Sequence, residues 1–313
     1  MAGAVEQYLK QLLTIHWLRP ETALWRTFDC LLMQDIAMTG RSADLGCGDG
    51  SMSYIMAGGQ VNNYDVFLDV GDLDGYNQGK DIHNVFTNRQ LESDDSQLRY
   101  RYCYGIDHKA ELINKTKRFR NFYYNNLVHD LNNAIPLPTE HLDAAFSNVL
   151  YWLEDIGKVL ADWNRVLKVN GKLILFVPNK NFKEQSWLYY KAPHQGADRY
   201  LNFFDRGYAS LIHHCYGSNQ WETYFSQNGF RVVDHKPYLT DIVMKVWNIG
   251  TRPIAAPLIK LASKLSPEDR REIRREWVDY FLNFFLPIVQ GEYSRECNED
   301  ECAFHFYVLE KVK

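Results

Sequence analysis

The spacing of hydrophobic positions changes along the chain, and this change predicts the order of its elements. Over residues 5–38 apolar residues recur three or four positions apart, which predicts helices with an interruption at Arg19-Pro20. From residue 42 onward, short apolar runs alternate with helical stretches. This alternation is typical of a parallel sheet whose strands are joined by helical crossovers. We therefore expect an α/β fold that follows a helical segment.

The alternation predicts about seven strands and the helices between them. Helices are expected from Ser51, over 109–118 and over 154–167, and 241–290 is expected to be mainly helical with breaks at Pro253, Pro257 and Pro267. A turn is expected at Asn170-Gly171. The last strand alternates poorly, which predicts that it is buried on both faces. The predicted strands are 42–45, 100–106, 121–128, 142–147, 172–177, 231–233 and 304–309.

Some segments interrupt the alternation and suggest insertions into one core. Residues 57–99 are rich in Gly, Asn and Asp, and residues 180–220 are rich in aromatic residues without a clear period. We expect a helical cap over 1–38 and a second helical cap, inserted into the core, over 241–303. The core itself is then expected to comprise 39–240 and 304–313, including the two insertions.

The composition and charge of the chain argue against some classes of partner. Hydrophobic residues make up 46% of the chain and charged residues 24%, as in ordinary globular proteins. The net charge is −4, so there is no broad basic field, and we expect no nucleic-acid partner. There is no apolar run of about 20 residues, so we expect no membrane insertion. The first residues lack a secretory signal pattern, so we expect a cytoplasmic location. The oligomeric state stays open.

No metal site is expected. The six cysteines include no CxxC pair. Four acids in the first insertion lack the spacing of a calcium loop and are interpreted as part of a polar loop; they are Asp69, Asp72, Asp74 and Asp81.

The stretch Ala43–Gly50, ADLGCGDG, carries the most informative chemistry. A strand ends there, glycines follow at every second position, and a helix is expected next. Glycines let a ligand lie against the backbone, and a helix start offers N–H groups. The dinucleotide fingerprint is GxGxxG, whereas this pattern is GxGxG beside Asp44 and Asp49. Two acids are unfavourable near a pyrophosphate and favourable near a cationic ligand.

This stretch resembles the first motif of the class I S-adenosylmethionine-dependent methyltransferases, of the small-molecule, type 11-like group. Further segments resemble later motifs of that family in the same order: 104–107, 129–131, 144–150 and 166–173. The resemblance implies a doubly wound, Rossmann-like sheet of seven strands. It also implies a C-terminal antiparallel hairpin at one edge, formed by strands near 231–238 and 304–311, cap insertions above the strand ends, and S-adenosylmethionine as cofactor.

The resemblance also implies roles for individual residues. The methionine part of the cofactor would be surrounded by Asp44 and the loop Gly46, Cys47 and Gly48. In that loop the backbone would take the carboxylate, and Asp44 would help to hold the ammonium. The other implied cofactor residues are Asp107 with His108 at the ribose, Asp130 and Leu131 at the adenine, and Asn148 beneath the sulfonium. Asp107 is expected at an exposed strand end, where its loss would not disturb the fold.

The catalytic group is not determined by the sequence. Where many relatives have a histidine after the fourth strand, this chain has Tyr151-Trp152. Trp152 suits either a cation–π contact with a sulfonium or core packing. The candidates for a general base are Tyr151, His194, His213 and His214.

The predicted activity is methyl transfer to an O, N or C nucleophile of a small molecule. The core with its polar insertion resembles methyltransferases of sugar-modifying pathways, which implies a sugar or glycan intermediate as acceptor. Two alternatives stay open. One is a catalytically silent, methyltransferase-like binding partner of another enzyme. The other is a nucleotide-dependent oxidoreductase, against which the glycine spacing argues.

Overall fold

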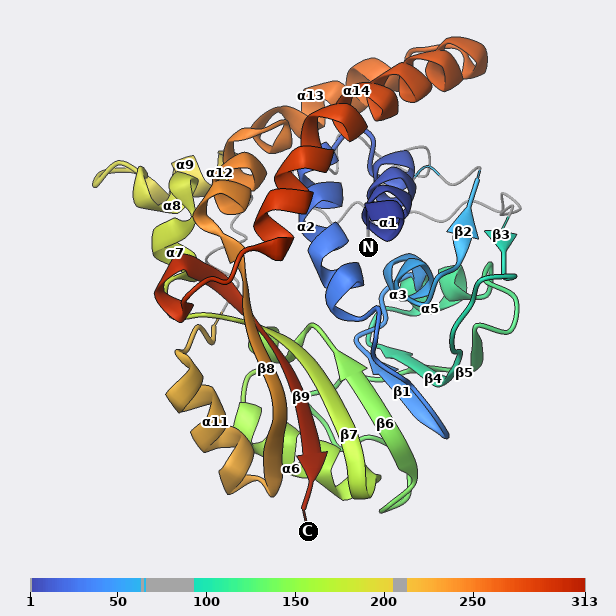
Figure 1. The fold of residues 1–313 in the computed structure, drawn as a ribbon, viewed down its shortest axis with the longest axis vertical. Helices are drawn as coiled ribbons and strands as arrows, with labels where there is room; N and C mark the ends of the chain where they lie inside the picture. The colour runs from blue at the N-terminus through green and yellow to red at the C-terminus, as the bar shows by residue number, and fades with distance from the viewer. Residues whose placement is uncertain (1, 63–64, 66–92, 205–212, 313) are drawn as a thin grey trace.

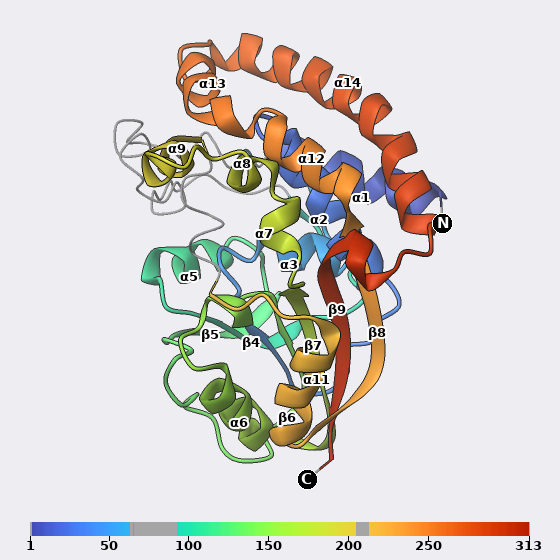
Figure 2. The ribbon, with the colours of Figure 1, turned by 90° about the vertical axis from the view of Figure 1, so that its left-hand side faces the viewer.

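A seven-stranded sheet lies at the centre of the computed structural model, which describes residues 2–62, 65, 93–204 and 213–312 (Figures 1 and 2). The strand order is β5-β4-β1-β6-β7-β9-β8, and the pairs are parallel except for those that β9 makes with β7 and β8. This arrangement confirms the predicted Rossmann-like sheet with an antiparallel hairpin at one edge. The strands are β1 Ser42–Leu45, β4 Tyr102–Asp107, β5 Tyr123–Val128, β6 Leu142–Ser147, β7 Leu167–Pro178, β8 Phe230–Thr240 and β9 Cys302–Lys311.

Both faces of the sheet are buried, as expected for strands with continuous apolar runs. In β7, Ile174 and Phe176 point to one hydrophobic cluster, while Leu173 and Leu175 point to the other. The second cluster is covered by α6 (Ile156–Val166) and α11 (Ser218–Gln227). The first is covered by helices from the N-terminal segment and from the segment between β8 and β9. These are α1 (Ala2–Ile15), α2 (Pro20–Leu32), α3 (Ser51–Met56), α12 (Asp241–Ile249), α13 (Ala255–Ala262) and α14 (Pro267–Ser294).

β7 and β8 extend furthest beyond the bounds predicted from the apolar pattern, and each contains an irregularity. The turn expected at Asn170 lies inside β7, where Asn170 has a φ of 63°. There Leu142 pairs with Leu167 while Ala144 pairs with Lys172, so the extra residues of β7 bulge out of register. A second register shift, between Val232 and Asp234, lies where the apolar pattern predicted the end of β8, and the strand continues to Thr240.

The helices α1, α2, α12 and α14 lie together on one side of the sheet and form a cap (Figures 1 and 2). α14 packs along α1 and α2, so the two cap segments, far apart in sequence, are in contact. Pro267 opens α14, with the Ser266 side chain accepting from the Asp269 N–H. Pro257, where a break was expected, lies within α13. In the first turn of a helix the N–H that proline lacks would have no intrahelical partner.

Shorter elements connect these layers. α5 (Ala110–Thr116) joins β4 to β5, and the 3₁₀ turn η2 (Leu150–Trp152) follows β6. Between β7 and α11 lie α7 (Phe182–Gln185), α8 (Trp187–Tyr190) and α9 (Ala197–Phe204). Further 3₁₀ turns are η3 (Arg252–Ile254) and η4 (Glu299–Glu301).

The ends of the first insertion are brought together by a small antiparallel pair. β2 (Gln60–Val61) pairs with β3 (Ser93–Asp94), which closes the insertion near its base. The interior of the insertion, with the four acids named above, lies outside the described residues.

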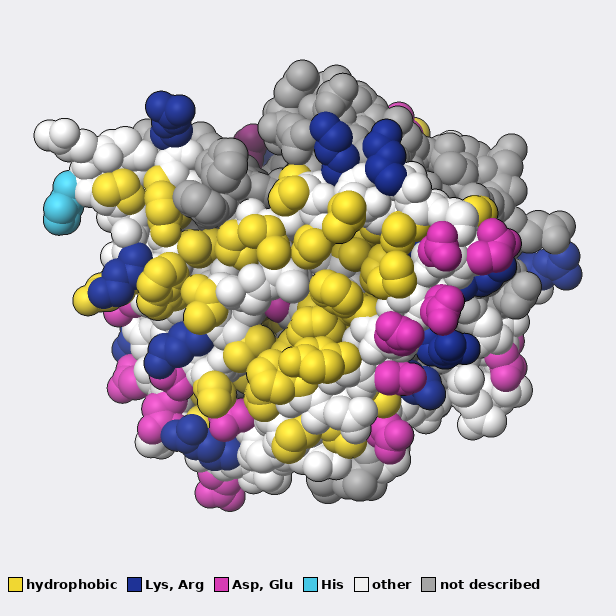
Figure 3. Space-filling model, turned by 90° about the horizontal axis from the view of Figure 1, so that it is seen from above, with side chains coloured by type: hydrophobic (Ala, Val, Ile, Leu, Met, Phe, Trp, Pro, Cys, Tyr) yellow, Lys and Arg dark blue, Asp and Glu magenta, His cyan; other side chains and the backbone are white. Residues whose placement is uncertain are grey.

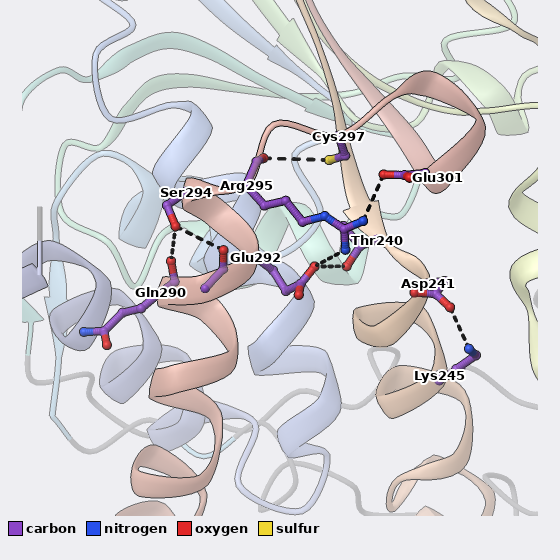
Figure 4. Close-up of polar contacts among 10 residues, drawn as sticks. Thr240, Asp241, Lys245, Gln290, Glu292, Ser294, Arg295, Cys297 and Glu301 are labelled. Atoms are coloured by element: carbon purple, nitrogen blue, oxygen red, sulfur yellow. Dashed lines mark hydrogen bonds and ion pairs between the residues drawn. The ribbon is translucent and has the colours of Figure 1, made fainter.

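Polar contacts fix the end of α14 to the hairpin of β8 and β9 (Figure 4). Thr240, at the end of β8, donates its hydroxyl to Glu292 at 2.6 Å. Arg295 follows α14 and pairs with Glu301, just before β9, at 3.1 Å. Thr240 is also the backbone partner of Cys302. The cap insertion therefore leaves and re-enters the sheet at one point.

Hydrophobic side chains form a band on the outer surface of the cap, with charged side chains around it (Figure 3). Exposed hydrophobic side chains include Leu261 of α13, with a relative exposure of 66%, and Tyr280 and Phe284 of α14. Even so, no helix in the described part of the chain is long and apolar enough to cross a membrane.

Candidate functional site

A cavity of about 600 Å³ lies between the carboxyl ends of the strands and the cap. This volume is within the range of small-molecule sites, about 300–1,000 Å³. Its sheet-side wall is formed by residues that follow β1, β4, β5 and β6. The position at the carboxyl edge of an open α/β sheet is the one in which ligands bind in such folds. The sheet-side lining residues are Gly46, Cys47, Gly48, Asp49, Asp107, His108, Lys109, Asp130, Leu131, Asn132, Asn148 and Val149.

Gly46 and Gly48, in the loop after β1, have different structural roles. Gly46 has a φ of 88°, and a Cβ there would lie 2.4 Å from Val149 Cγ2. Gly46 therefore allows close packing of two loops. Gly48 has a φ of 57°, and a Cβ there would meet nothing within 4 Å. Because Gly48 lines the cavity, its bare backbone leaves open surface for a ligand.

The N–H groups of this loop are already engaged, which differs from our expectation. Gly46 and Cys47 donate to the Ile106 carbonyl at 2.8 and 3.0 Å, and Gly48 donates to Asp107 Oδ2 at 3.0 Å. These bonds hold a chain of left-handed glycines in one shape. A ligand carboxylate would therefore need donors other than these three groups.

Asp107 joins the first loop to the turn after β4. Its Oδ2 accepts from Gly48, and its Oδ1 accepts from the Lys109 N–H at 2.9 Å. His108 Nδ1 lies 3.5 Å from Oδ1. The residue is only 8% exposed, so the expectation of an exposed strand end is wrong. Its side chain has a structural task as well as a place in the cavity wall.

Residues after β5 and β6 also line the cavity, and those after β5 include one polar and one apolar side chain. Asp130 follows β5 and accepts from the Asn132 N–H at 3.0 Å, while its neighbour Leu131 is 6% exposed. Asn148 follows β6 directly after Ser147, whose hydroxyl donates to the Leu45 carbonyl at 2.8 Å. That bond fixes the end of β6 against β1.

Asp44 lies behind the loop and is not among the cavity-lining residues, which also differs from our expectation. It is buried and accepts from the Tyr123 hydroxyl at 2.6 Å. Burial raises the pKa of Asp44 to about 6, against hydrogen bonds from Ser53 and Tyr123 that lower it. Burial, together with Asp44 and Asp107, raises the pKa of the Cys47 thiol. Cys47 is thus a protonated wall residue.

The expected general-base candidates do not reach the cavity. Tyr151 is 1% exposed and packs in the core, and His194 and His213 are exposed elsewhere. Both ring nitrogens of His214 have partners, the Leu153 carbonyl at 2.8 Å and the Tyr216 hydroxyl at 2.9 Å. By contrast, Trp152 lines the cavity and is 39% exposed.

The cap contributes lining residues that no motif in the sequence indicated. They lie at the corner between α1 and α2, within α2 itself and on α12. No signal in the sequence separates Thr22 and Arg26 from the other polar residues of α2, Glu21, Thr27 and Asp29, which are buried. The cap-side lining residues are His16, Arg19, Thr22, Trp25, Arg26 and Trp247.

Comparison with known protein families decides the class. Residues 88–175, which include β4, β5 and β6, match a family model described as a methyltransferase domain. The chain belongs to the class I S-adenosylmethionine-dependent methyltransferases. S-adenosylmethionine is accordingly the cofactor of this methyltransferase. The glycine loop lies outside the matched residues, because the long first insertion separates it from them.

Solved structures share the general chain path of this methyltransferase at low similarity. The [4+2]-cyclase SpnF is 14% identical, with 92% of this chain and 80% of that chain covered and a TM-score of 0.48. An S-adenosylmethionine-dependent methyltransferase from Thermotoga maritima is 12% identical, with 99% of each chain covered and a TM-score of 0.46. Geranyl diphosphate methyltransferase, solved with S-adenosylmethionine, is 10% identical, with 94% and 90% covered and a TM-score of 0.44. With TM-scores below 0.5, these likenesses carry no argument about the acceptor.

No curated protein sequence matches the chain significantly. Among the described residues, no group of three or more His, Cys, Asp or Glu side chains could hold a metal ion.

Proposed function

We propose that this methyltransferase binds its cofactor along the sheet-side wall and methylates an O, N or C atom of a small molecule held against the cap. The observation that carries this proposal is the convergence of four strand ends on one cavity beneath a helical cap. The division into a cap over 1–38, a core, and a second cap over 241–303 is part of the same proposal.

The sheet-side residues suit the parts of S-adenosylmethionine in order. The open backbone at Gly48 lies beside the methionine part, and Asn148 forms the floor beneath the sulfonium. Asp107 takes the ribose hydroxyls, because a carboxylate has about four acceptor sites and the two backbone N–H groups use only part of them. Asp130 and Leu131 provide an acceptor and an apolar surface for the adenine.

The methionine carboxylate requires donors other than the N–H groups of Gly46, Cys47 and Gly48. Arg19 lines the same cavity, and its Nε lies 3.5 Å from Glu21 Oε1, which is buried and steadies the guanidinium. We assign the carboxylate to Arg19. Asp44 acts from behind by holding Tyr123 under the loop rather than by touching the ligand.

The cofactor supplies a methyl group on a sulfonium, which is a good leaving group. The residues of the chain then have to align the acceptor and exclude water. The partly exposed ring of Trp152 can stabilise a nearby cation by about 0.5–2 kcal/mol through a cation–π contact. A base is needed for a hydroxyl acceptor, and His16 is a cap-side histidine that lines the cavity.

A sugar or glycan intermediate is the first acceptor class to examine, on the sequence resemblance given above. The silent-partner alternative differs in one observable respect. A silent protein would bind the cofactor and yet methylate none of the acceptors offered.

Calorimetric titration with S-adenosylmethionine, S-adenosylhomocysteine and NADH tests the proposal. We expect the two sulfur ligands to bind in the micromolar range and NADH not to bind. Binding of NADH alone would contradict the proposal.

Variants of Asp107 test the cofactor assignment itself. Asp107→Asn keeps one acceptor oxygen for the loop, whereas Asp107→Ala removes both. We expect both variants to bind S-adenosylhomocysteine at least about tenfold more weakly, since a lost charge-assisted hydrogen bond costs about 1.5–3 kcal/mol. Both variants should also lose thermal stability, and the alanine variant should lose more, because asparagine can still accept from one of the two backbone N–H groups. Unchanged affinity in the asparagine variant would remove Asp107 from the ribose site.

A further inference from the structure

Two cysteines flank one tight turn at the point where the cap insertion re-enters the sheet. Cys297 follows α14, and Cys302 is the first residue of β9. The turn η4 lies between them and is closed by a hydrogen bond from the Glu301 N–H to the Asn298 carbonyl at 3.0 Å. A four-residue turn of this kind keeps its first and last Cα atoms within about 7 Å. The two cysteines on either side of it share a hydrogen bond between their side chains.

The sheet fixes one end of this turn. The Asn179 side chain, just after β7, donates to the carbonyls of Glu299 and Cys302 at 2.7 and 2.8 Å. The Ser218 N–H, at the start of α11, donates to the Glu299 carboxylate at 2.9 Å. Cys302 is also the strand partner of Thr240 in β8. Cys302 therefore has a fixed position, and Cys297 lies on the irregular segment that faces it.

The two thiols differ in exposure and in acidity. Cys302 is fully buried, whereas Cys297 is partly exposed and its sulfur lies 4.0 Å from the Arg295 carbonyl oxygen (Figure 4). The hydrogen bond from Cys302 lowers the pKa of Cys297, and Arg295 lowers it further against the effect of partial burial. The same hydrogen bond, together with burial, raises the pKa of Cys302. The pair thus combines an accessible thiolate with a protonated thiol beside it.

Cys215 offers a matched comparison within the same chain. It is also partly exposed, but burial raises its pKa to about 11. Because the thiolate is the nucleophile, Cys215 is expected to react far more slowly than Cys297 near neutral pH.

From this arrangement we propose that Cys297 and Cys302 form a reversible oxidation site for a hydroperoxide. Cys297 is the thiol that reacts with the peroxide, and Cys302 is the thiol that resolves the product into a disulfide. Oxidation selects accessible cysteines that have a low pKa and a second cysteine nearby. Neither residue lines the cavity, so the site is separate from the one proposed for methyl transfer.

The reaction balances with hydrogen peroxide as the oxidant. The Cys297 thiolate attacks one peroxide oxygen, so an S–O bond forms, the O–O bond breaks, and the leaving hydroxide takes up a proton to become water. The Cys302 sulfur then attacks the sulfur of the resulting sulfenic acid. The S–S bond forms, the S–O bond breaks, and hydroxide leaves with the Cys302 proton as a second water. Overall the two thiols lose two electrons and two protons, and a dithiol reductant restores them.

The disulfide connects the chain after α14 to β9, and so fastens the cap insertion to the sheet at its point of re-entry. A cross-link stabilises a fold mainly by restricting the unfolded chain. We therefore expect the oxidised protein to melt at a higher temperature than the reduced protein. Its affinity for S-adenosylhomocysteine should not change, because the cavity lining is untouched.

The test treats the reduced full-length protein with a small molar excess of hydrogen peroxide and then blocks free thiols with iodoacetamide. Trypsin cleaves after Arg295 and Lys311, so both cysteines lie in the single peptide 296–311. By mass spectrometry we expect this peptide to be lighter by two hydrogen atoms and to carry no iodoacetamide label. Dithiothreitol should restore both labels. In the reduced protein at pH 7, Cys297 should be labelled more than about tenfold faster than Cys215.

Three variants separate the two roles. Cys297→Ser should abolish the peroxide reaction of this peptide. Cys302→Ala should leave the sulfenic acid on Cys297, where dimedone captures it, whereas the wild type should give little of that adduct. Cys215→Ser is the matched control and should form the disulfide as the wild type does.

Any of four results would overturn the proposal. Peptide 296–311 keeps both thiols under peroxide, or Cys215 is labelled as fast as Cys297. The disulfide joins two chains rather than one, as a non-reducing gel would show. The oxidised protein melts at a lower temperature, which would mean that the bond does not fit the native turn. None of these measurements depends on cofactor binding, so they stand apart from the test of the proposed function.

Discussion

At the scale of single residues, Asp44 shows how a site can depend on a group that no ligand touches. Its carboxyl is buried behind the glycine loop with Tyr123, and its pKa is raised to about 6 by that burial. A carboxyl with a raised folded-state pKa favours folding while it is protonated. Its ionisation therefore lowers stability as the pH rises from about 4 through about 6.

Asp44→Asn should remove this pH dependence. Relative to the wild type, the variant should gain stability between pH 4 and pH 7, by on the order of 3 kcal/mol for a pKa rise from 3.8 to about 6. Asparagine can still accept from the Tyr123 hydroxyl. Urea unfolding of both proteins at the two pH values measures the difference. A stability difference that does not change with pH would show that Asp44 is not buried as an ionisable group.

The two glycines of the loop should respond to alanine to different degrees. At Gly46 the new methyl group would lie 2.4 Å from Val149 Cγ2, so Gly46→Ala should lower the free energy of unfolding by about 2 kcal/mol or more. At Gly48 the methyl group meets nothing and costs only left-handed strain, about 1–2 kcal/mol.

Gly48→Ala should nevertheless weaken cofactor binding, because its methyl group occupies surface that the ligand needs. Melting temperature and calorimetric titration with S-adenosylhomocysteine separate the two effects. Equal loss of stability in both variants, with equal affinity, would mean that the loop relaxes away from the observed shape.

At the scale of elements, the sequence predicts a strand correctly where a local pattern sets its bounds. β6 has the predicted bounds, Leu142–Ser147, and all of its residues except Asp143 are buried. The apolar pattern predicted β8 only to Val233, because a bulge between Val232 and Asp234 exchanges the faces and erases the alternation, whereas the resemblance implied a strand to about residue 238.

In the site as well, some residues could be predicted from local sequence motifs, and others depend on tertiary packing. The strand-end residues Gly48, Asp107 and Asp130 follow local motifs, and the structure brings them to one cavity. Arg26 belongs to no motif. Arg26 reaches the cavity because of the way in which α2 packs. His214 does not line the cavity, and both of its ring nitrogens have hydrogen-bond partners.

Trp25 connects three elements and gives a prediction at this scale. Its ring lies 4.8 Å from Trp247 of α12 and 4.9 Å from Phe304 of β9. Trp25→Ala should lower the free energy of unfolding by about 3–5 kcal/mol, because a large buried cavity forms where α2 meets the sheet. Denaturant unfolding provides the measurement.

Trp187→Ala is the matched control for that variant, since Trp187 is 40% exposed on α8. Its cost should be much smaller. A similar cost for the two variants would show that Trp25 does not couple the cap to the sheet.

At the scale of the whole molecule, the cap and the sheet share one hydrophobic cluster. Leu12 of α1, Trp25 of α2, Met244 of α12 and Phe285 of α14 belong to the same cluster as Phe306 of β9. The cap is therefore a separate segment in sequence and part of the same core in space.

Deletion of the second cap segment tests this view. Thr240 and Cys302 are paired neighbours, so a short turn could replace residues 241–301 and leave β8 and β9 hydrogen-bonded. If the sheet were independent, this shortened chain would fold. Because the deletion uncovers one buried face of the sheet, we expect instead a loss of cooperative unfolding and of near-ultraviolet circular dichroism, with binding of a hydrophobic dye. A shortened chain that melts in one sharp transition would show that the core folds without its cap. The acceptor side of the cavity could then be exchanged without rebuilding the cofactor side.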